Sequence, residues 1–198
     1  GQYFTNWRHD AHVIKPFPLP QAWRMWAALD YGFTHYTAVH FFAEDGDGNV
    51  YVIGEHAEQR WLPQRHAEAI KAKIERLNVL DDNSKKTAVN LSKFWPFVAG
   101  ADVFAQRGTG RTIAEQYADN GITLQPAKTD RVSGWAKILE YLGDMDVEPV
   151  IKPRMFIFDT CARLIECIPS LEHDPNRPED VLKVAQSADQ GALPILYA

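Results

Sequence analysis

Two aspartates stand where the sequence could place carboxylates for chemistry. Asp30 follows the apolar run Ala27-Ala28-Leu29, and Asp102 follows the apolar run 97–101. Each is predicted to lie at the end of a buried strand, where a carboxylate is costly unless it is paired or hydrogen-bonded. Asp30 has two interpretations, a metal ligand or a turn residue that caps the backbone of Tyr31-Gly32, and the residues alone favour the turn.

The two aspartates could form a single site if their strands are parallel neighbours in one sheet. Asp30 and Asp102 would then lie side by side, and their mutual repulsion would favour a cation between them. Carboxylate oxygens are ligands that Mg²⁺ and Mn²⁺ prefer. Two such ions about 4 Å apart activate a water molecule and stabilise the leaving oxygen of a phosphodiester. Under that condition, the two aspartates would be suited to metal-assisted hydrolysis.

Motifs of several other enzyme classes are absent from the sequence. Residues 107–112 lack the lysine and the spacing of an ATP-binding P-loop, and no nucleophile elbow or zinc-protease helix motif occurs. His9 and His12 lie in a stretch not expected to be helical, so we predict surface histidines rather than a zinc pair. Cys161 and Cys167 do not face each other on their predicted helix, so we expect free thiols and a reducing compartment.

The composition is that of a folded chain with unevenly distributed charge. Of the 198 residues, 45% are hydrophobic and 24% are charged, and no run is long and apolar enough for a membrane span. The net charge of −5 argues against a simple nucleic-acid binder. Residues 83–137 nevertheless carry eight Lys or Arg against four Asp or Glu. Charge fluctuation and a patch that faces a polyanion explain this segment equally well.

Residue patterns predict a mixed sheet that would position the aspartates. Residues 1–21, rich in proline, predict an extended lead-in. Residues 22–30, 34–44 and 50–58 predict three strands joined by hairpins. The remaining elements are predicted as a helix at 63–78, a polar loop at 80–87, a strand within 94–101, a helix at 111–120, a strand at 121–124, a helix at 131–142, a strand at 155–158 and a helix at 160–168 that stops at Pro169. This order predicts one α/β domain over residues 1–198, with a mixed sheet flanked by helices. It is the order expected of a ribonuclease H-like fold, and it also fits other α/β domains.

Short segments along the chain carry a family resemblance. They are His12–Ile14 with Pro16-Phe17, Ala28–Gly32, Asp47–Val52 with Glu55, Ala101-Asp102, Thr112–Glu115, Gly121–Leu124, Ala127–Gly134, Cys161, Ile168-Pro169 and Pro178–Val181. In this order they resemble the C-terminal nuclease domain of the large terminase subunit of tailed bacteriophages. The resemblance implies a ribonuclease H-like, metal-dependent endonuclease that cuts concatemeric double-stranded phage DNA during genome packaging. It also implies two Mg²⁺ or Mn²⁺ ions, and as partners an N-terminal ATPase domain, the small terminase subunit and the portal, in the cytoplasm of the infected bacterium and without a membrane.

The family pattern implies roles for three aspartates. Asp30 is the first metal-binding acid and Asp102 the second. The third acid of the family precedes a tyrosine by four residues, and alignment on Tyr197 puts that position on Leu193. We therefore take Asp189, one helical turn earlier, as the third catalytic and metal-binding candidate. A helix-capping role for Asp189 is an equal alternative.

Other residues complete the set of candidates. Asp180 and Asp159 are fallbacks for the third acid. Lys128, Arg131 and Lys137 lie in the basic segment. We expect them to contact the DNA backbone without sequence preference, and a solvated helix face is the alternative.

Two other functions stay open. A different ribonuclease H-like enzyme, such as a junction resolvase or a transposase-like strand transferase, would need acids at the same positions. A catalytically weak or inactive domain that grips DNA or docks the motor on its portal is favoured by the apolar Leu193 at the family's third acid position.

Overall fold

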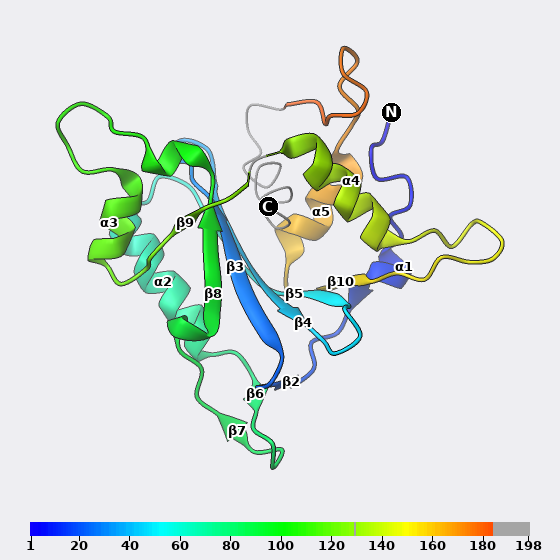
Figure 1. Ribbon diagram of the computed structural model, residues 1–198, viewed down its shortest axis with the longest axis horizontal. Helices are drawn as coiled ribbons and strands as arrows, with labels where there is room; N and C mark the ends of the chain where they lie inside the picture. Colours follow the sequence, from blue (N-terminus) through cyan, green and yellow to red (C-terminus); the bar gives the residue numbers. More distant parts are fainter. Residues whose placement is uncertain (129, 184–198) are drawn as a thin grey trace.

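A seven-stranded mixed sheet is the centre of the computed structural model, which describes residues 1–128 and 130–183 (Figure 1). The strand order is β1-β10-β5-β4-β3-β8-β9. The strands are β1 (Val13–Ile14), β3 (Arg24–Asp30), β4 (Thr37–Glu44), β5 (Val50–Glu58), β8 (Phe94–Ala99), β9 (Gln125–Pro126) and β10 (Met155–Phe158). β4 is antiparallel to both neighbours and the other pairings are parallel, so six carboxyl ends share one edge of the sheet. The predicted α/β class and mixed sheet are confirmed.

The two predicted hairpins form as expected. β4 pairs antiparallel with β3 on one side and with β5 on the other. The turn between β4 and β5 is stabilised by Asp45, whose carboxylate accepts the N–H groups of Asp47 and Asn49 at 2.9 and 3.0 Å. A short polar side chain that bonds its own turn in this way is the reason that Asp and Asn mark such positions in sequences.

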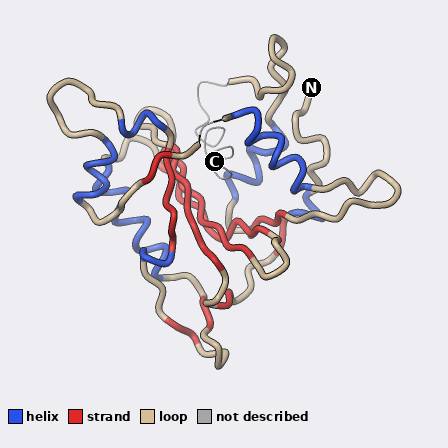
Figure 2. Tube along the Cα trace, in the orientation of Figure 1, coloured by secondary structure: helices blue, strands red, loops and turns tan. Residues whose placement is uncertain are grey.

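Helices cover both faces of the sheet (Figure 2). α2 (Pro63–Glu75) and α3 (Ile113–Asp119) lie on one face, and α4 (Arg131–Leu142) and α5 (Ala162–Ser170) lie on the other. Alternate residues of β3 divide between them, because Ala27 and Leu29 join the core under α2, whereas Trp26 and Ala28 join the core under α4 and α5. Asp30 continues the second series, so its side chain belongs to the α4–α5 face.

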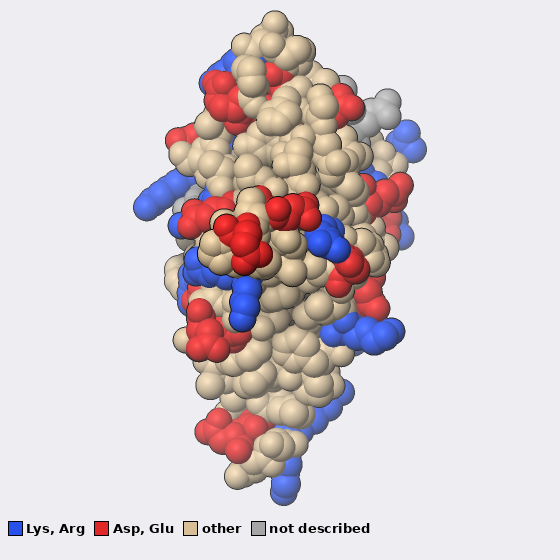
Figure 3. Space-filling view, turned by 90° about the vertical axis from the view of Figure 1, so that its right-hand side faces the viewer, with Lys and Arg blue, Asp and Glu red and all other residues tan. Residues whose placement is uncertain are grey.

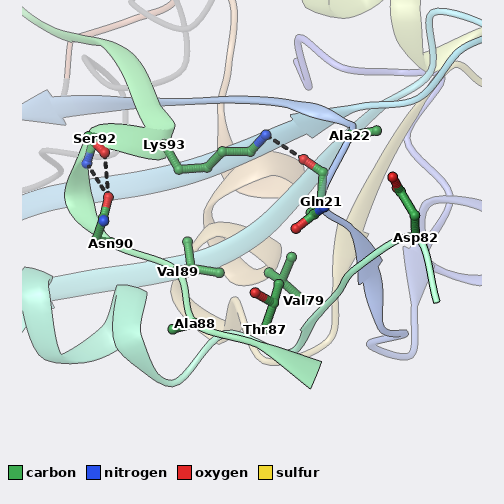
Figure 4. A pocket seen from close by; sticks show the side chains of 10 residues that line it. All are labelled: Gln21, Ala22, Val79, Asp82, Thr87, Ala88, Val89, Asn90, Ser92 and Lys93. Atoms are coloured by element: carbon green, nitrogen blue, oxygen red, sulfur yellow. Dashed lines mark hydrogen bonds between the residues drawn. The ribbon is translucent and has the colours of Figure 1, made fainter. Parts of the chain in front are cut away.

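A small second sheet lies at the amino end of β3. It contains β2 (Leu19–Pro20), β6 (Val79–Leu80) and β7 (Lys86–Thr87). A cavity of about 600 Å³ adjoins it, where the Lys93 ammonium donates to the Gln21 carbonyl (Figure 4). Because Gln21 precedes β3 and Asp30 ends it, this cavity and the candidate aspartates are at opposite ends of the strand. The region 80–87, predicted as a polar loop, contains a short hairpin formed by β6 and β7. Its two-residue strands are too short for a sequence pattern to predict.

The beginning of the chain differs from the predicted extended lead-in. Residues 1–21 contain α1 (His9–His12) as well as β1 and β2. His12 is wrongly predicted as a surface residue: it is fully buried, with Nε2 2.7 Å from the Leu142 carbonyl oxygen and its ring stacked on Trp7. The contact with Leu142 joins residues 130 positions apart, so no local sequence pattern can predict it.

Two further boundaries differ from expectation. The strand expected at 121–124 is wrong, because the residues that pair with β8 are Gln125 and Pro126. Ile122 and Leu124 are buried as loop residues, and buried alternation alone resembles a strand. α5 continues through Pro169 to Ser170, because a proline in the last turn removes only one intrahelical bond. Two 3₁₀ turns, η1 (Leu91–Lys93) and η2 (Ala101–Phe104), flank β8.

Two other expectations can be checked. Cys161 and Cys167 are free thiols, as predicted. Among the residues that the structure describes, no helix has the length and apolar character needed to cross a bilayer.

A buried histidine pair joins β5 to α2. Nε2 of His56 lies 2.8 Å from Nδ1 of His66, and both rings contact Trp61. The two side chains are 4% and 0% exposed. Burial lowers the pKa of each histidine from 6.5 to about 4, and each ring has a neighbouring cationic or titratable group that acts in the same direction. The native fold therefore keeps both rings neutral.

Acid should destabilise the fold through this pair. The unfolded chain binds protons as the pH falls below about 6.5, whereas the native pair resists protonation until about pH 4. At about 1.4 kcal/mol per pKa unit, urea unfolding should show a loss of about 3 kcal/mol or more from pH 7 to pH 4. His66→Leu should reduce this loss, and the exposed control His35→Gln should not. An equal pH slope in wild type and His66→Leu would contradict the assignment.

Candidate metal centre

The strands that carry the two candidate aspartates are parallel neighbours. β3 pairs with β8 in the register Ala28↔Val98 and Leu29↔Ala99. Asp30 is the last residue of β3, and Asp102 lies in η2, which follows β8 after Gly100. Adjacent strands lie about 4.8 Å apart, so both carboxylates arise at one short stretch of the sheet edge. The predicted neighbour relationship between the two strands is confirmed.

A tight loop fixes how the chain leaves Asp30. The Gly32 N–H donates to the Thr37 hydroxyl at 3.0 Å, and that hydroxyl donates to the Gly32 carbonyl at 2.6 Å. A Cβ atom at Gly32 would lie 2.6 Å from the Tyr36 carbonyl oxygen, so only glycine fits this approach. The Gly32 amide, which a capping Asp30 would bind, is thus used by Thr37. Asp30 is half-buried and Asp102 is exposed.

The charges of Asp102 and Arg107 both act on the Tyr31 phenol. Burial raises the pKa of its phenol, the Arg107 charge acts against this rise, and the Asp102 charge adds to it. The phenol is therefore neutral, and it is within electrostatic reach of both Arg107 and Asp102. Next to it in the same core, burial also raises the pKa of Tyr117.

Solved structures share this architecture over the whole chain, although no family model and no curated protein sequence matches. The nuclease domain of the P22 large terminase matches with a TM-score of 0.69 and 18% identity, over 100% of this chain and 91% of that chain. The large terminase nuclease from the thermophilic phage G20c with bound cobalt matches with a TM-score of 0.60 and 11% identity, over 99% and 96%. The chain has the fold of a large terminase nuclease domain.

One matched protein is much longer than this chain, and the match covers only part of it. The large terminase of another thermophilic bacteriophage, in complex with ADP, matches with a TM-score of 0.72 and 15% identity. The match covers 100% of this chain but 44% of that chain, so this chain spans less than half of that terminase. At identities this low, the matches show the terminase nuclease fold, and the chemistry of individual residues depends on the geometry of the site.

The carboxylate oxygens at this edge are of the type that binds a divalent cation, but two acids alone are few ligands for such an ion. Carboxylates from Asp30 and Asp102 are hard oxygen donors of the kind that Mg²⁺ and Mn²⁺ prefer. Within residues 1–128 and 130–183, no group of three or more His, Cys, Asp or Glu side chains is arranged to hold a metal ion. Asp189 and Leu193 lie outside the described residues, so the position of a third acid stays a prediction.

The two fallback acids lie elsewhere in the terminase nuclease fold. Asp180 is 6% exposed and accepts the Trp135 indole N–H at 3.0 Å, with the Arg131 Nε 3.6 Å away. This bonding indicates a structural role between α4 and the segment that follows α5. Asp159 follows β10, which is three strands from β3, or about 14 Å along the sheet. Asp159 is too far from Asp30 by this geometry to complete its donor set, and Asp180 forms no three-ligand group with other described residues.

The three predicted DNA-contacting residues have different surroundings. Lys128 is exposed just beyond β9, and Lys137 is exposed on α4 with its ammonium 5.6 Å from the centre of the Tyr141 ring. Arg131 is half-buried and forms the ion pair with Asp180, so its charge is already used within the fold. Contact of these side chains with DNA remains a prediction. Of the two exposed lysines, Lys128 is the one that follows the carboxyl end of a strand parallel to β8.

Sequence reasoning missed an acid–base pair beside the site. Nε2 of His40 lies 2.8 Å from the Glu55 carboxylate, which also accepts the N–H groups of Arg163 and Leu164 at 3.0 and 2.9 Å. Counting outward from the hairpin turn would pair His40 with Gly54. A bulge between Phe41 and Phe42 shifts the ladder by one residue, so His40 faces Glu55 instead. The sequence therefore predicts the His40–Glu55 pair only if the bulge is already known.

The loop after Asp30 should tolerate no side chain at Gly32. Gly32→Ala places a Cβ against backbone atoms that cannot yield cheaply, and we expect a loss of about 1–3 kcal/mol in the free energy of unfolding. Gly46→Ala is the matched control, because nothing lies within 4 Å of a Cβ there. Urea unfolding of both variants is the measurement, and equal stability of the two would refute the close approach.

Proposed function

We propose that the chain is a metal-dependent endonuclease that cleaves double-stranded phage DNA during genome packaging. One observation carries the proposal: Asp30 and Asp102 follow two adjacent parallel strands at the same sheet edge. The fold is that of nuclease domains, and relatives in fold have been solved with bound cobalt, zinc and manganese.

The chemistry follows from the donors at this edge. Two divalent ions, Mg²⁺ or Mn²⁺, would activate a water molecule and stabilise the leaving oxygen of the phosphodiester when bound. Asp30 and Asp102 would hold them, with Asp189 as the candidate third ligand. Thr37 and Gly32 keep the Asp30 loop rigid.

DNA would approach the carboxyl edge of the sheet rather than the flank formed by α1, α4 and the loop 143–154. On that flank, basic side chains are interspersed with acidic ones, and acids gather near the centre of the view (Figure 3). Such a surface does not attract a polyanion strongly. Contacts at the carboxyl edge would be made to phosphates, so little sequence preference is expected.

The resemblance extends the proposal to partners and location. We propose that the chain works with an N-terminal ATPase domain, the small terminase subunit and the portal, in the cytoplasm of the infected bacterium. A second candidate is a catalytically weak or inactive domain that grips DNA or docks on the portal. The observation in its favour is that the described part of the chain holds two acids at the site and no three-ligand group.

Plasmid cleavage tests the proposed activity. Supercoiled DNA should be nicked and linearised with Mn²⁺ or Mg²⁺, and chelator should abolish the reaction. Asp30→Ala and Asp102→Ala should each reduce the rate by about 100-fold or more, the scale on which removal of one catalytic electrostatic group acts. Asp82→Asn, an exposed acid at the opposite end of the sheet, should cleave like wild type.

The outcomes separate the two candidates. Cleavage that persists with chelator, or an unchanged rate for Asp30→Ala, would overturn the two-metal proposal. A folded protein with no cleavage and no shift of Tm with Mn²⁺ would favour the gripping or docking domain, because a ligand that binds only the native state must raise Tm.

A further inference from the structure

The first turn of α5 brings a cation to the candidate metal edge. β10 ends at Phe158 and α5 begins at Ala162, so the helix starts at the edge where the parallel strands end. The guanidinium carbon of Arg163 lies 3.5 Å from the centre of the Tyr36 ring. Tyr36 belongs to the short loop that connects Asp30 to β4.

Tyr36 connects this guanidinium to the strand position opposite Asp30. The Tyr36 side chain packs on Ala38, and Ala38 is the residue directly opposite Asp30 in the β3–β4 ladder. Directly opposed residues of an antiparallel pair project from the same face, so both belong to the α4–α5 face. A continuous set of contacts therefore leads from Arg163 through Tyr36 and Ala38 to the position next to Asp30.

A buried pair anchors the turn that carries Arg163. The Glu55 carboxylate accepts the N–H groups of Arg163 and Leu164 and lies 2.8 Å from His40 Nε2. The His40 and Glu55 side chains are 1% and 8% exposed. Burial alone would raise the pKa of Glu55, but the bonds from His40 and from the two amides outweigh it and lower the pKa. Glu55 thus uses two amides of the first turn, and the charged side chain that this turn carries is Arg163, which is half-buried.

We propose that Arg163 binds a backbone phosphate of duplex DNA next to the candidate metal centre. Tyr36 and Glu55 act as positioning residues for its guanidinium. The inference rests on the proposed nuclease function and adds a specific phosphate contact to it. Arginine suits this role because its planar guanidinium stacks on an aromatic ring and still donates N–H groups to a phosphate from its edge.

The chain contains a matched control at the other end of β10. Arg154 directly precedes β10, and its guanidinium carbon lies 4.5 Å from the centre of the Tyr141 ring. Arg154 and Arg163 therefore share residue type and a contact with a tyrosine ring, and they lie beyond opposite ends of β10, Arg154 directly before it and Arg163 in α5. Replacing either with glutamine removes one charge and one stacking contact.

Binding of a 20-bp duplex, measured by fluorescence anisotropy in chelator over a range of KCl, tests the contact. Arg163→Gln should raise the Kd by about 5–20-fold at low salt and reduce the slope of log Kd against log[KCl] by about 0.9. Arg163→Lys should keep the wild-type slope, because it keeps the charge, while it binds more weakly than wild type. Arg154→Gln should match wild type in both Kd and slope.

A double-mutant cycle tests the positioning role of Glu55. Glu55→Gln should weaken duplex binding a few-fold when Arg163 is present and should add nothing in the Arg163→Gln background, because both changes act through one guanidinium. Equal effects in both backgrounds would mean that Glu55 serves the fold only. Thermal melting of each variant confirms that the comparison is made between folded proteins.

The outcomes are distinct from those of the cleavage assay. Wild-type Kd and slope for Arg163→Gln, an equal loss in Arg154→Gln, or no duplex binding by wild type would each overturn the proposal. Because binding is measured without divalent metal, a protein that binds through Arg163 but never cleaves would retain this inference and lose the proposed nuclease function.

Discussion

The parallel ladder between β3 and β8 is the constraint on which the candidate site depends. It brings Asp30 and Asp102 from positions 72 residues apart in the sequence to adjacent strand ends. A parallel pair cannot be joined by a tight turn, so the chain between them must leave the sheet and return. That connection contains β4, β5, α2 and two strands of the small second sheet, β6 and β7. The site therefore depends on elements such as β6 and β7 that lie at the opposite end of β3.

Electrostatics at the carboxyl edge depend on burial and on which face each group occupies. Two histidine-containing pairs on neighbouring strands show the contrast. Glu55 and His40 lie on the α5 side, where lowering of the Glu55 pKa preserves a charged anchor for the first turn of α5. His56 and His66 lie on the α2 side, where burial lowers both pKa values to about 4 and the pair stays neutral. A one-residue change in strand register exchanges these environments, so the bulge in β4–β5 matters to both pairs.

Strong local patterns made much of the fold predictable. The strand at 50–58 and the helix at 131–142 have the predicted bounds, because each is a periodic run that ends at clear turn residues. The β3–β8 pairing was only a condition of the sequence argument, which started from two apolar runs that are each followed by an aspartate. The burial of His12 and the bond between His40 and Glu55 were not, because each depends on long-range packing or on a bulge that shifts the register. Identities of 11–18% with proteins of the same fold are consistent with this division, since alternation and register can persist while residue types change.

Strand direction decides which of two similar groups can serve the site. Arg154 and Arg163 flank the four-residue strand β10, and each guanidinium lies over a tyrosine ring. β10 runs parallel to β5, as β3 does to β8, so its carboxyl end points to the edge that bears the two aspartates. Arg163 follows that end, and Arg154 precedes the opposite one. Chemistry of this kind is therefore a property of topology as much as of residue type, because the same arginine–tyrosine stack acquires a phosphate-binding position only where the parallel strands end.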